Sequence, residues 1–367
     1  MLLEYKTQNS RKWAIPEKLI QLAYENNKFD PELYTKYDVK RGLRNSNGTG
    51  VLVGLTSIGD VLGYKMENGK KVPIEGRLLY RGIDIEELIA GFQAEGRFGF
   101  EETCYLLLFG ELPNKQELDE FTRVLGVNRT LPDGFTEDMI LKSPSNSVMN
   151  MLAKSILAYY SYDHNPDDIS LENVLRQSIE LIARFPTMVA YAYQSLSRYH
   201  NNKSLFIHNP QPELSTAENF LYMIRPNSKY SKLEAELLDL ALVLHAEHGG
   251  GNNSTFTIRV VTSTDTDTYS AVAAAVGSLK GGKHGGANIK VIEMMKNIMD
   301  NVKDWNDEEE IQNYLVKILE KKAYDKSGLI YGIGHAVYTI SDPRAVLLKA
   351  KAAELAKEKG LEQVFNL

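Results

Sequence analysis

The sequence predicts a mainly α-helical protein with one small antiparallel β-hairpin near its N-terminus. Apolar residues return at intervals of three and four positions along most of the 367 residues, which is the spacing of amphipathic helices. Strand-like patterning is confined to residues 54–81. Within that segment, Asn68 and Gly69 separate two apolar runs, and an Asn-Gly pair favours a tight hairpin because both residues tolerate positive φ.

The remaining elements are predicted to be helices. By apolar spacing they cover residues 83–92, 100–108, 115–125, 147–160, 171–183, 187–198, 217–223, 233–244, 270–279, 289–302 and 307–322. Gly110 and Pro113 form a typical stop signal after the second of them. Residues 199–212 are rich in asparagine and proline, which predicts an exposed connection. A last amphipathic helix is expected within residues 345–367.

Composition excludes several functions. Lys and Arg number 42 against 48 for Asp and Glu, so no bulk positive field is available for nucleic acid. A single cysteine, Cys104, excludes an intrachain disulfide and a cysteine metal cluster, which fits a reducing compartment. Charges at Glu4 and Lys6 precede any apolar stretch long enough for a signal peptide, and no run approaches the roughly 20 residues of a membrane span. We therefore expect a cytoplasmic protein without membrane contact.

Three of the seven histidines lie in glycine-rich settings: His248, His284 and His335. Glycine beside an imidazole removes side-chain bulk and lets a ligand or the backbone come close. Each histidine alone is compatible with an ordinary turn, because glycine is the usual turn residue. Three repetitions of the arrangement indicate one site.

The chemistry of these histidines points to a keto acid. His284 precedes a predicted helix, whose positive end disfavours imidazolium, so a neutral ring could donate a hydrogen bond to a developing enolate oxygen. His335 is followed nine positions later by Arg344, and an arginine fork near a histidine suits a small acid with a carboxylate and a carbonyl.

A zinc hydrolase is the competing interpretation, because His245 and His248 flank Glu247 at a spacing of three and His284 could complete a ligand set. Zinc ligands at that spacing need a helix to align them, whereas the three glycines of residues 249–251 end the helix at the second histidine. The sequence contains neither a phosphate-binding loop nor a dinucleotide fingerprint. We therefore expect no metal at this site.

Four segments resemble the citrate synthase family. They are Gly76–Leu88 with Phe100–Pro113, then Leu244–Thr255, then His284–Asn288, and finally Gly332–Arg344, which is the most specific. The resemblance covers nearly the whole chain in matching order. It implies a mainly α, two-domain citrate synthase-like fold, with a large helical domain over residues 1–283 and a small, incomplete domain over residues 284–367.

The resemblance also implies an acyltransferase that condenses acetyl-CoA with oxaloacetate and hydrolyses citryl-CoA, with no further cofactor and as a homodimer. Carried over by motif, His248 and Arg344 would bind oxaloacetate, His284 would stabilise the enol of acetyl-CoA, and His335 would polarise the ketone and protonate its alkoxide. Two further assignments are implied. Asn252 would line the pocket, and the backbone of Leu329, Ile330, Tyr331 and Gly332 would hold CoA.

The sequence departs from the family after Arg344. Members of the family continue into a segment that carries an aspartate base and further arginines, whereas residues 345–367 contain no aspartate and no arginine. Glu354, Glu358 and Glu362 are expected on a solvated helix face. We therefore expect a citrate synthase that is truncated at the C-terminus, and we expect these 367 residues to be nearly inactive.

Two alternatives stay open at this stage. A 2-methylcitrate synthase would use propionyl-CoA, and one extra methylene changes specificity only about 10- to 200-fold, by packing that these motifs do not define. A non-catalytic relative would keep the acid pocket without the base.

Overall fold

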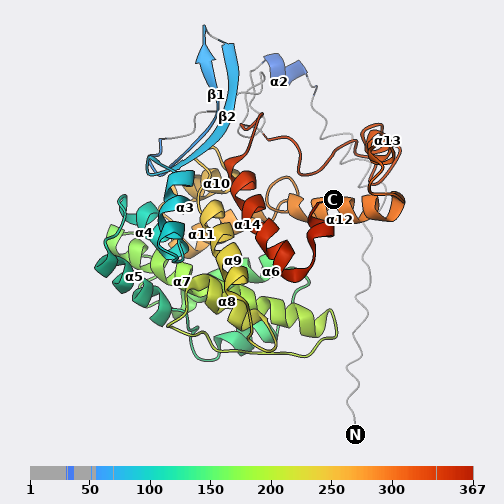
Figure 1. The fold of residues 1–367 in the computed structure, drawn as a ribbon. Helices are drawn as coiled ribbons and strands as arrows, with labels where there is room; N and C mark the ends of the chain where they lie inside the picture. Colours follow the sequence, from blue (N-terminus) through green and yellow to red (C-terminus); the bar gives the residue numbers. More distant parts are fainter. Residues whose placement is uncertain are drawn as a thin grey trace, which may run out of the picture. The chain divides into compact units, whose positions relative to one another are not determined.

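The computed structural model describes residues 30, 32–36, 51, 55–68, 70–335 and 337–366. The chain forms two compact units, Met1–Leu52 and Val53–Leu367. In the first unit, the described part contains α2 (Glu32–Lys36). The site and all the elements below belong to the second unit, which is mainly helical, as predicted (Figure 1). Among the described helices, none is both long and apolar enough to cross a membrane.

The predicted hairpin is confirmed, and Gly69 of the predicted Asn-Gly turn lies outside the described residues. Strand β1 (Gly59–Glu67) pairs antiparallel with β2 (Lys70–Tyr80), and Asn68 takes a positive φ of 50° at the turn. The register shifts between Leu62 and Tyr64, which places a bulge at Gly63. A short third strand, β3 (Ile83–Asp84), pairs with the end of β2, so the helix predicted from residue 83 begins two residues later.

The other elements of this unit are helices. They are α3 (Ile85–Ala94), α4 (Phe100–Phe109), α5 (Lys115–Val127), the π-helix η1 (Thr136–Leu141), α6 (Val148–Tyr159), the 3₁₀ turn η2 (Tyr160–Tyr162), α7 (Leu171–Tyr199), α8 (Thr216–Ile224), α9 (Lys232–His245), α10 (Asn253–Thr262), α11 (Thr268–Leu279), α12 (Ala287–Asn301), α13 (Glu308–Leu319), α14 (Pro343–Lys359) and α15 (Glu362–Phe365). Capping explains several starts: Asn114, Ser215 and Ser231 each form a capping box with a glutamate three residues later.

The prediction of two separate helices around Pro186 was wrong. Residues 171–183 and 187–198 were expected as two helices because Pro186 lacks an N–H and usually interrupts a helix. The structure has a single 29-residue helix, α7, that contains Pro186. Thr187, Met188 and Ala190 directly after the proline are fully buried. Burial along the helix therefore outweighs the loss of one backbone hydrogen bond.

Helix α10 was not predicted. Its apolar residues include the β-branched Ile258, Val260 and Val261, and the three glycines of residues 249–251 precede it, so local propensity favours a loop. The helix begins because the Asn252 side chain accepts a hydrogen bond from the Ser254 N–H (2.8 Å).

Two cores position the site. Helices α6, α7 and α11 share a cluster around Phe135, Ile156 and Tyr269. A second cluster joins the hairpin to α3, α4 and α9, and it includes Leu78 and Tyr80. Helix α14 packs on α9 and on β2, as its place beside α9 in Figure 1 shows. Helices α12 and α13 share a separate small cluster that includes Ile298 and Ile318. The domain boundary at residues 283/284 stays a prediction.

Two glycines let the hairpin approach residues 337–341 closely. A Cβ built on Gly63 would lie 2.3 Å from the Val337 carbonyl oxygen, and one built on Gly76 would lie 2.2 Å from that of Ser341. The Gly76 N–H also donates to Ser341 Oγ (3.1 Å), and that hydroxyl bonds the Glu75 carboxylate. The backbone of 337–341 is therefore held against β1 and β2.

The Gly76→Ala variant tests this contact. The added methyl overlaps the backbone of residue 341, so the two segments must separate, and we expect a loss of about 1–3 kcal/mol in the free energy of unfolding. Urea denaturation followed by circular dichroism measures it. Gly91→Ala is the control, because it lies within α3 with open space around its Cβ and should stabilise the helix by up to about 1 kcal/mol. Equal stabilities of the Gly76→Ala and parent proteins would contradict the prediction.

Candidate active site

The segment that carries His248 is fixed from strand β2. Tyr80, fully buried at the end of that strand, donates its hydroxyl to the Val243 carbonyl (2.8 Å) and accepts from the Glu247 N–H (3.3 Å). The Glu247 carboxylate in turn accepts from the Gly249 N–H (2.6 Å), and Gly249 has a φ of +75°, which favours glycine. The turn after α9 is therefore held in one conformation.

His248 is half-buried, and its ring is neutral at physiological pH. Burial, followed by the positive charge of Arg344, lowers the pKa of His248 to about 4. Its Nε2 atom is buried without a hydrogen-bond partner among the described residues. Buried polar atoms in proteins are nearly always paired. A nitrogen in this state fits a site that receives a polar ligand.

His335 contacts His248 from a segment 87 residues further along the chain. The two ring centroids lie 5.3 Å apart in an edge-to-face arrangement. Nδ1 of His335 accepts hydrogen bonds from the backbone N–H groups of Val337 (3.1 Å) and Tyr338 (3.0 Å). An accepting Nδ1 assigns the proton of the neutral ring to Nε2. The exposed ring of His335 thus has an N–H donor on Nε2.

Arg344 lies in the first turn of α14 and is paired with Asp342. Its Nε and Nη2 donate to the two carboxylate oxygens at 3.0 and 2.7 Å, and the same carboxylate caps the helix through the Arg344 N–H (3.0 Å). Burial raises the pKa of Asp342, but the hydrogen bonds and charge of Arg344 outweigh it, so the net shift is downward. The arginine fork is thereby oriented before any ligand binds.

The structure brings three predicted residues together around a fourth. The ring of Tyr338 stacks on His335 with centroids 4.9 Å apart, meets the edge of His248 at 5.7 Å, and lies 5.8 Å from the Arg344 guanidinium carbon. These four residues are called the His248–Arg344 cluster below. Sequence reasoning missed Tyr338, although it lies in the segment that carries His335.

His284 is linked to a different neighbour. It lies in the turn before α12, and its Nε2 is 3.1 Å from the Ser254 hydroxyl of α10. The described contacts connect this ring to α10 and not to the rings of His248 and His335. The predicted position before a helix is confirmed, while its role stays a prediction. No sequence signal identified Ser254, because 30 residues separate the two.

Asn252 serves as the cap of α10. Its side-chain oxygen accepts from the Ser254 N–H (2.8 Å), and its carbonyl accepts from the Phe256 N–H (2.9 Å). Asn252 thus fixes the start of the helix whose Ser254 contacts His284. Its predicted place in the substrate pocket is untested.

The four residues predicted to hold CoA lie along the α12–α13 cluster. Ile330 and Tyr331 pack against that cluster, and the Tyr331 hydroxyl donates to Asp325 (2.7 Å). Gly332 has a φ of +87°, and its Cβ position would lie 3.3 Å from a Val291 methyl. Leu329 is exposed. These residues lead directly into the segment of His335.

The alternative metal set is not assembled in the described part of the chain, which holds no group of three or more histidine, cysteine, aspartate or glutamate side chains placed to bind a metal. Nδ1 of His245 lies 2.6 Å from the Ala241 carbonyl oxygen within α9. His248 is instead part of the cluster with His335 and Tyr338.

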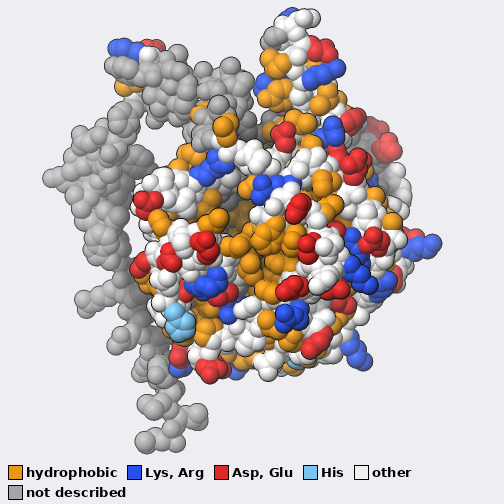
Figure 2. All heavy atoms as spheres, turned by 90° about the vertical axis from the view of Figure 1, so that its left-hand side faces the viewer, with side chains coloured by type: hydrophobic (Ala, Val, Ile, Leu, Met, Phe, Trp, Pro, Cys, Tyr) orange, Lys and Arg blue, Asp and Glu red, His pale blue; other side chains and the backbone are white. Residues whose placement is uncertain are grey.

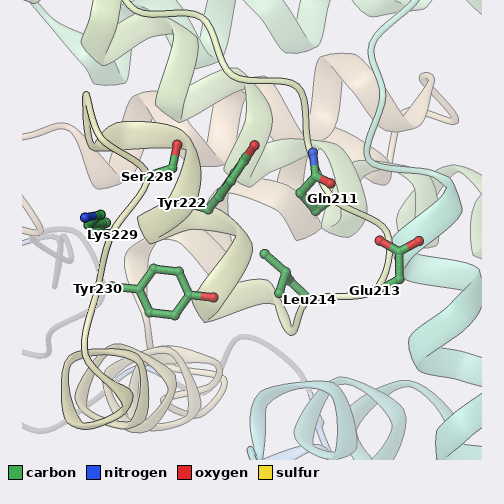
Figure 3. A pocket seen from close by; sticks show the side chains of 7 residues that line it. All are labelled: Gln211, Glu213, Leu214, Tyr222, Ser228, Lys229 and Tyr230. Atoms are coloured by element: carbon green, nitrogen blue, oxygen red, sulfur yellow. The ribbon is translucent and has the colours of Figure 1, made fainter.

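A cavity of about 670 Å³ lies elsewhere, beside α8. Its lining comes from the connections on either side of α8 and from the helix itself: Gln211, Glu213, Leu214, Tyr222, Ser228, Lys229 and Tyr230 (Figure 3). It contains none of the predicted site residues. In Figure 3 the rings of Tyr222 and Tyr230 border it on one side and Glu213 on the other.

The comparison with protein families decides the identity. A family model described as "Citrate synthase, C-terminal domain" matches residues 46–367. The chain belongs to the citrate synthase family. Its members are acyltransferases, and the predicted enzyme class is confirmed. The citrate synthase of Haloferax volcanii is 36% identical over 289 residues, which cover 78% of this chain and 70% of that protein. The 2-methylcitrate synthase of Shewanella oneidensis is 31% identical over 293 residues, or 79% and 70%.

Solved citrate synthases share the fold. That of Pyrobaculum aerophilum is 31% identical with a TM-score of 0.66, and the match covers 85% of this chain and 70% of that one. That of Thermoplasma acidophilum, solved as a ternary complex with carboxymethyl coenzyme A and oxaloacetate, is 26% identical with a TM-score of 0.67, covering 84% and 72%. The predicted citrate synthase-like fold is therefore confirmed.

Proposed function

We propose that this chain binds oxaloacetate and acetyl-CoA and supplies the pocket in which they condense to citryl-CoA, which is then hydrolysed to citrate and CoA. One observation carries the proposal: His248 contacts the ring of Tyr338, and so do His335 and Arg344, which lie 87 and 96 residues further along the chain. Two imidazoles and an arginine fork suit a small keto dicarboxylate. The Thermoplasma relative was solved with oxaloacetate and a CoA analogue.

In this proposal the ketone of oxaloacetate accepts a hydrogen bond from Nε2–H of His335. The same proton neutralises the alkoxide that develops as the new carbon–carbon bond forms. Arg344 binds a carboxylate of oxaloacetate in place of part of its contact with Asp342. The buried Nε2 of neutral His248 faces the same ligand.

His284 would stabilise the enol of acetyl-CoA. Its ring lies just before α12, where the positive end of the helix favours a negative oxygen nearby. If Ser254 donates to Nε2, the proton of the ring is on Nδ1 and is directed to the enol oxygen. Asn252 caps the start of α10 and so positions Ser254, which contacts His284. The backbone of residues 329–332 supplies groups for binding CoA.

Residues 345–367 contain no aspartate, the residue type that supplies the base for acetyl-CoA in the family. Glu354, Glu358 and Glu362 are exposed on α14 and α15, and Glu354 pairs with Lys351 (3.1 Å), as the sequence predicted for a solvated face. A positioned base is worth about 100- to 10,000-fold. We therefore propose that these 367 residues bind oxaloacetate and turn over at least about 100-fold more slowly than a relative with the base.

A homodimer in the cytoplasm is part of the proposal. Helix α10 carries Phe256, Ile258, Val260 and Val261 but has no buried residue. Hydrophobic side chains also gather near the middle of the face shown in Figure 2. Exposed apolar patches of this kind mark interaction surfaces. Light scattering on the purified chain measures the assembly.

Two measurements test the function. Isothermal titration gives oxaloacetate affinity, and detection of citrate by mass spectrometry gives turnover with acetyl-CoA, beside the Haloferax volcanii enzyme as a reference. Absence of oxaloacetate binding would refute the pocket, and turnover within about tenfold of the reference would refute the slow condensation.

The second candidate is 2-methylcitrate synthesis, which the Shewanella relative favours. Faster turnover with propionyl-CoA than with acetyl-CoA would establish it.

A further inference from the structure

Tyr338 is the common neighbour of the predicted oxaloacetate ligands, and it has no assigned role. It is 5% exposed, and its ring is stacked on His335 with an interplanar angle of 26°. The same ring meets His248 nearly at right angles, at 80°, and has the Arg344 guanidinium on its face. A change in the angle of this ring would therefore move all three groups.

Both the side chain and the backbone of Tyr338 form hydrogen bonds that fix its position. Its hydroxyl donates to the Arg77 carbonyl of β2 (3.2 Å), and burial raises its pKa to about 12, so it keeps this proton at neutral pH. Its backbone N–H donates to Nδ1 of His335 (3.0 Å). The absent side chain of Gly76 provides the space for the ring, because a Cβ there would lie 2.7 Å from Cδ1 of Tyr338.

We propose that Tyr338 is a positioning residue, which fixes the angle of the His335 ring relative to His248 and Arg344 and keeps the His335 proton on Nε2. The proposal rests on the proposed function for its substrate, and Tyr338 acts through the other three residues. Its ring prevents His335 from turning, and its N–H accounts for one of the two donors to Nδ1. A ring that cannot turn presents Nε2–H to the ketone without further ordering.

Two variants separate the parts of this role. Tyr338→Leu removes the ring that stacks on His335, so the orientation of the His335 ring is less restricted. We expect mixed tautomers of His335 in the ring ¹⁵N spectrum and oxaloacetate affinity about tenfold lower. Tyr338→Phe keeps the ring and removes the bond to the Arg77 carbonyl, so we expect the Nε2–H tautomer to remain and affinity to fall about threefold. Loss of the corresponding signal in His335→Gln assigns the spectrum.

Tyr314→Leu is the matched control. Its hydroxyl donates to Asn297 (2.8 Å) between α13 and α12, and its loss should leave both readouts unchanged. A folded Tyr338→Leu variant with the parent tautomer and parent affinity would overturn the proposal. If that variant does not fold, parent-like affinity of Tyr338→Phe overturns it. A parent chain that binds no oxaloacetate would refute the proposed function, while the tautomer comparison would still decide the role of Tyr338.

Discussion

The Arg344→Gln variant is expected to bind oxaloacetate about 100-fold more weakly than the parent chain, since the charge-assisted pairing with a carboxylate is lost and such a hydrogen bond contributes about 1.5–3 kcal/mol. Glutamine preserves length and polarity but neither the charge nor the planar fork. Asp342, which now pairs with both sides of this guanidinium, would lose its partner but still cap α14. Isothermal titration at constant ionic strength measures the change.

Arg225→Gln is the matched control for this variant. Arg225 forms a comparable two-bond pair with Glu234 (2.8 and 2.9 Å), outside the His248–Arg344 cluster. Its loss should lower stability slightly and leave oxaloacetate affinity unchanged. If both arginine variants bind oxaloacetate as the parent does, Arg344 is not a ligand of the substrate.

Asp239 is expected to make the fold less stable as pH rises from about 4 to about 7. Burial, followed by the nearby Glu101 carboxylate, raises the pKa of Asp239 to about 7, outweighing its hydrogen bonds from the N–H groups of Gly99 and Phe100. The folded chain thus holds this proton more tightly than the unfolded chain, in which the pKa is about 4. The stabilisation is complete below pH 4 and is lost as pH rises to 7, by up to about 4 kcal/mol.

Urea denaturation across pH 4 to 8 measures this slope. In Asp239→Asn the side chain cannot ionise, so its contribution to the slope disappears, while the amide oxygen can accept from only one of the two N–H groups at the start of α4. Glu120→Gln, at an exposed position of α5, should keep the parent slope. Parallel curves for Asp239→Asn and the parent would contradict the assignment of the slope to Asp239.

Local signals were enough for much of the fold. Asn68 indicated the hairpin because asparagine tolerates the positive φ that the turn requires. Helix α5 was predictable because Asn114 and Glu117 form its capping box within one turn. Helix α7 was not, because its continuity through Pro186 depends on burial by helices distant in sequence.

The candidate site likewise has residues that the sequence predicted and residues that it did not. Its chemistry could be predicted, since His248, His335 and Arg344 lie in distinctive segments. Its supports could not, since Tyr80 and Tyr338 are ordinary core aromatics until the backbone places them. The contact of Ser254 with His284 likewise depends on α10, a helix that local propensity disfavours.

The contacts of strand β2 with the segments that carry His248 and His335 affect the rate of folding. Its bonds to the site segments join residues 163, 261 and 265 positions apart, through Tyr80, Tyr338 and Ser341. Contacts of such separation form slowly, because the entropy of closing a long loop is lost before they contribute. During refolding, helical signal should therefore recover before the capacity to bind substrate. During synthesis, the hairpin is made long before residues 338–341, so strand β2 lacks these partners until that segment has emerged.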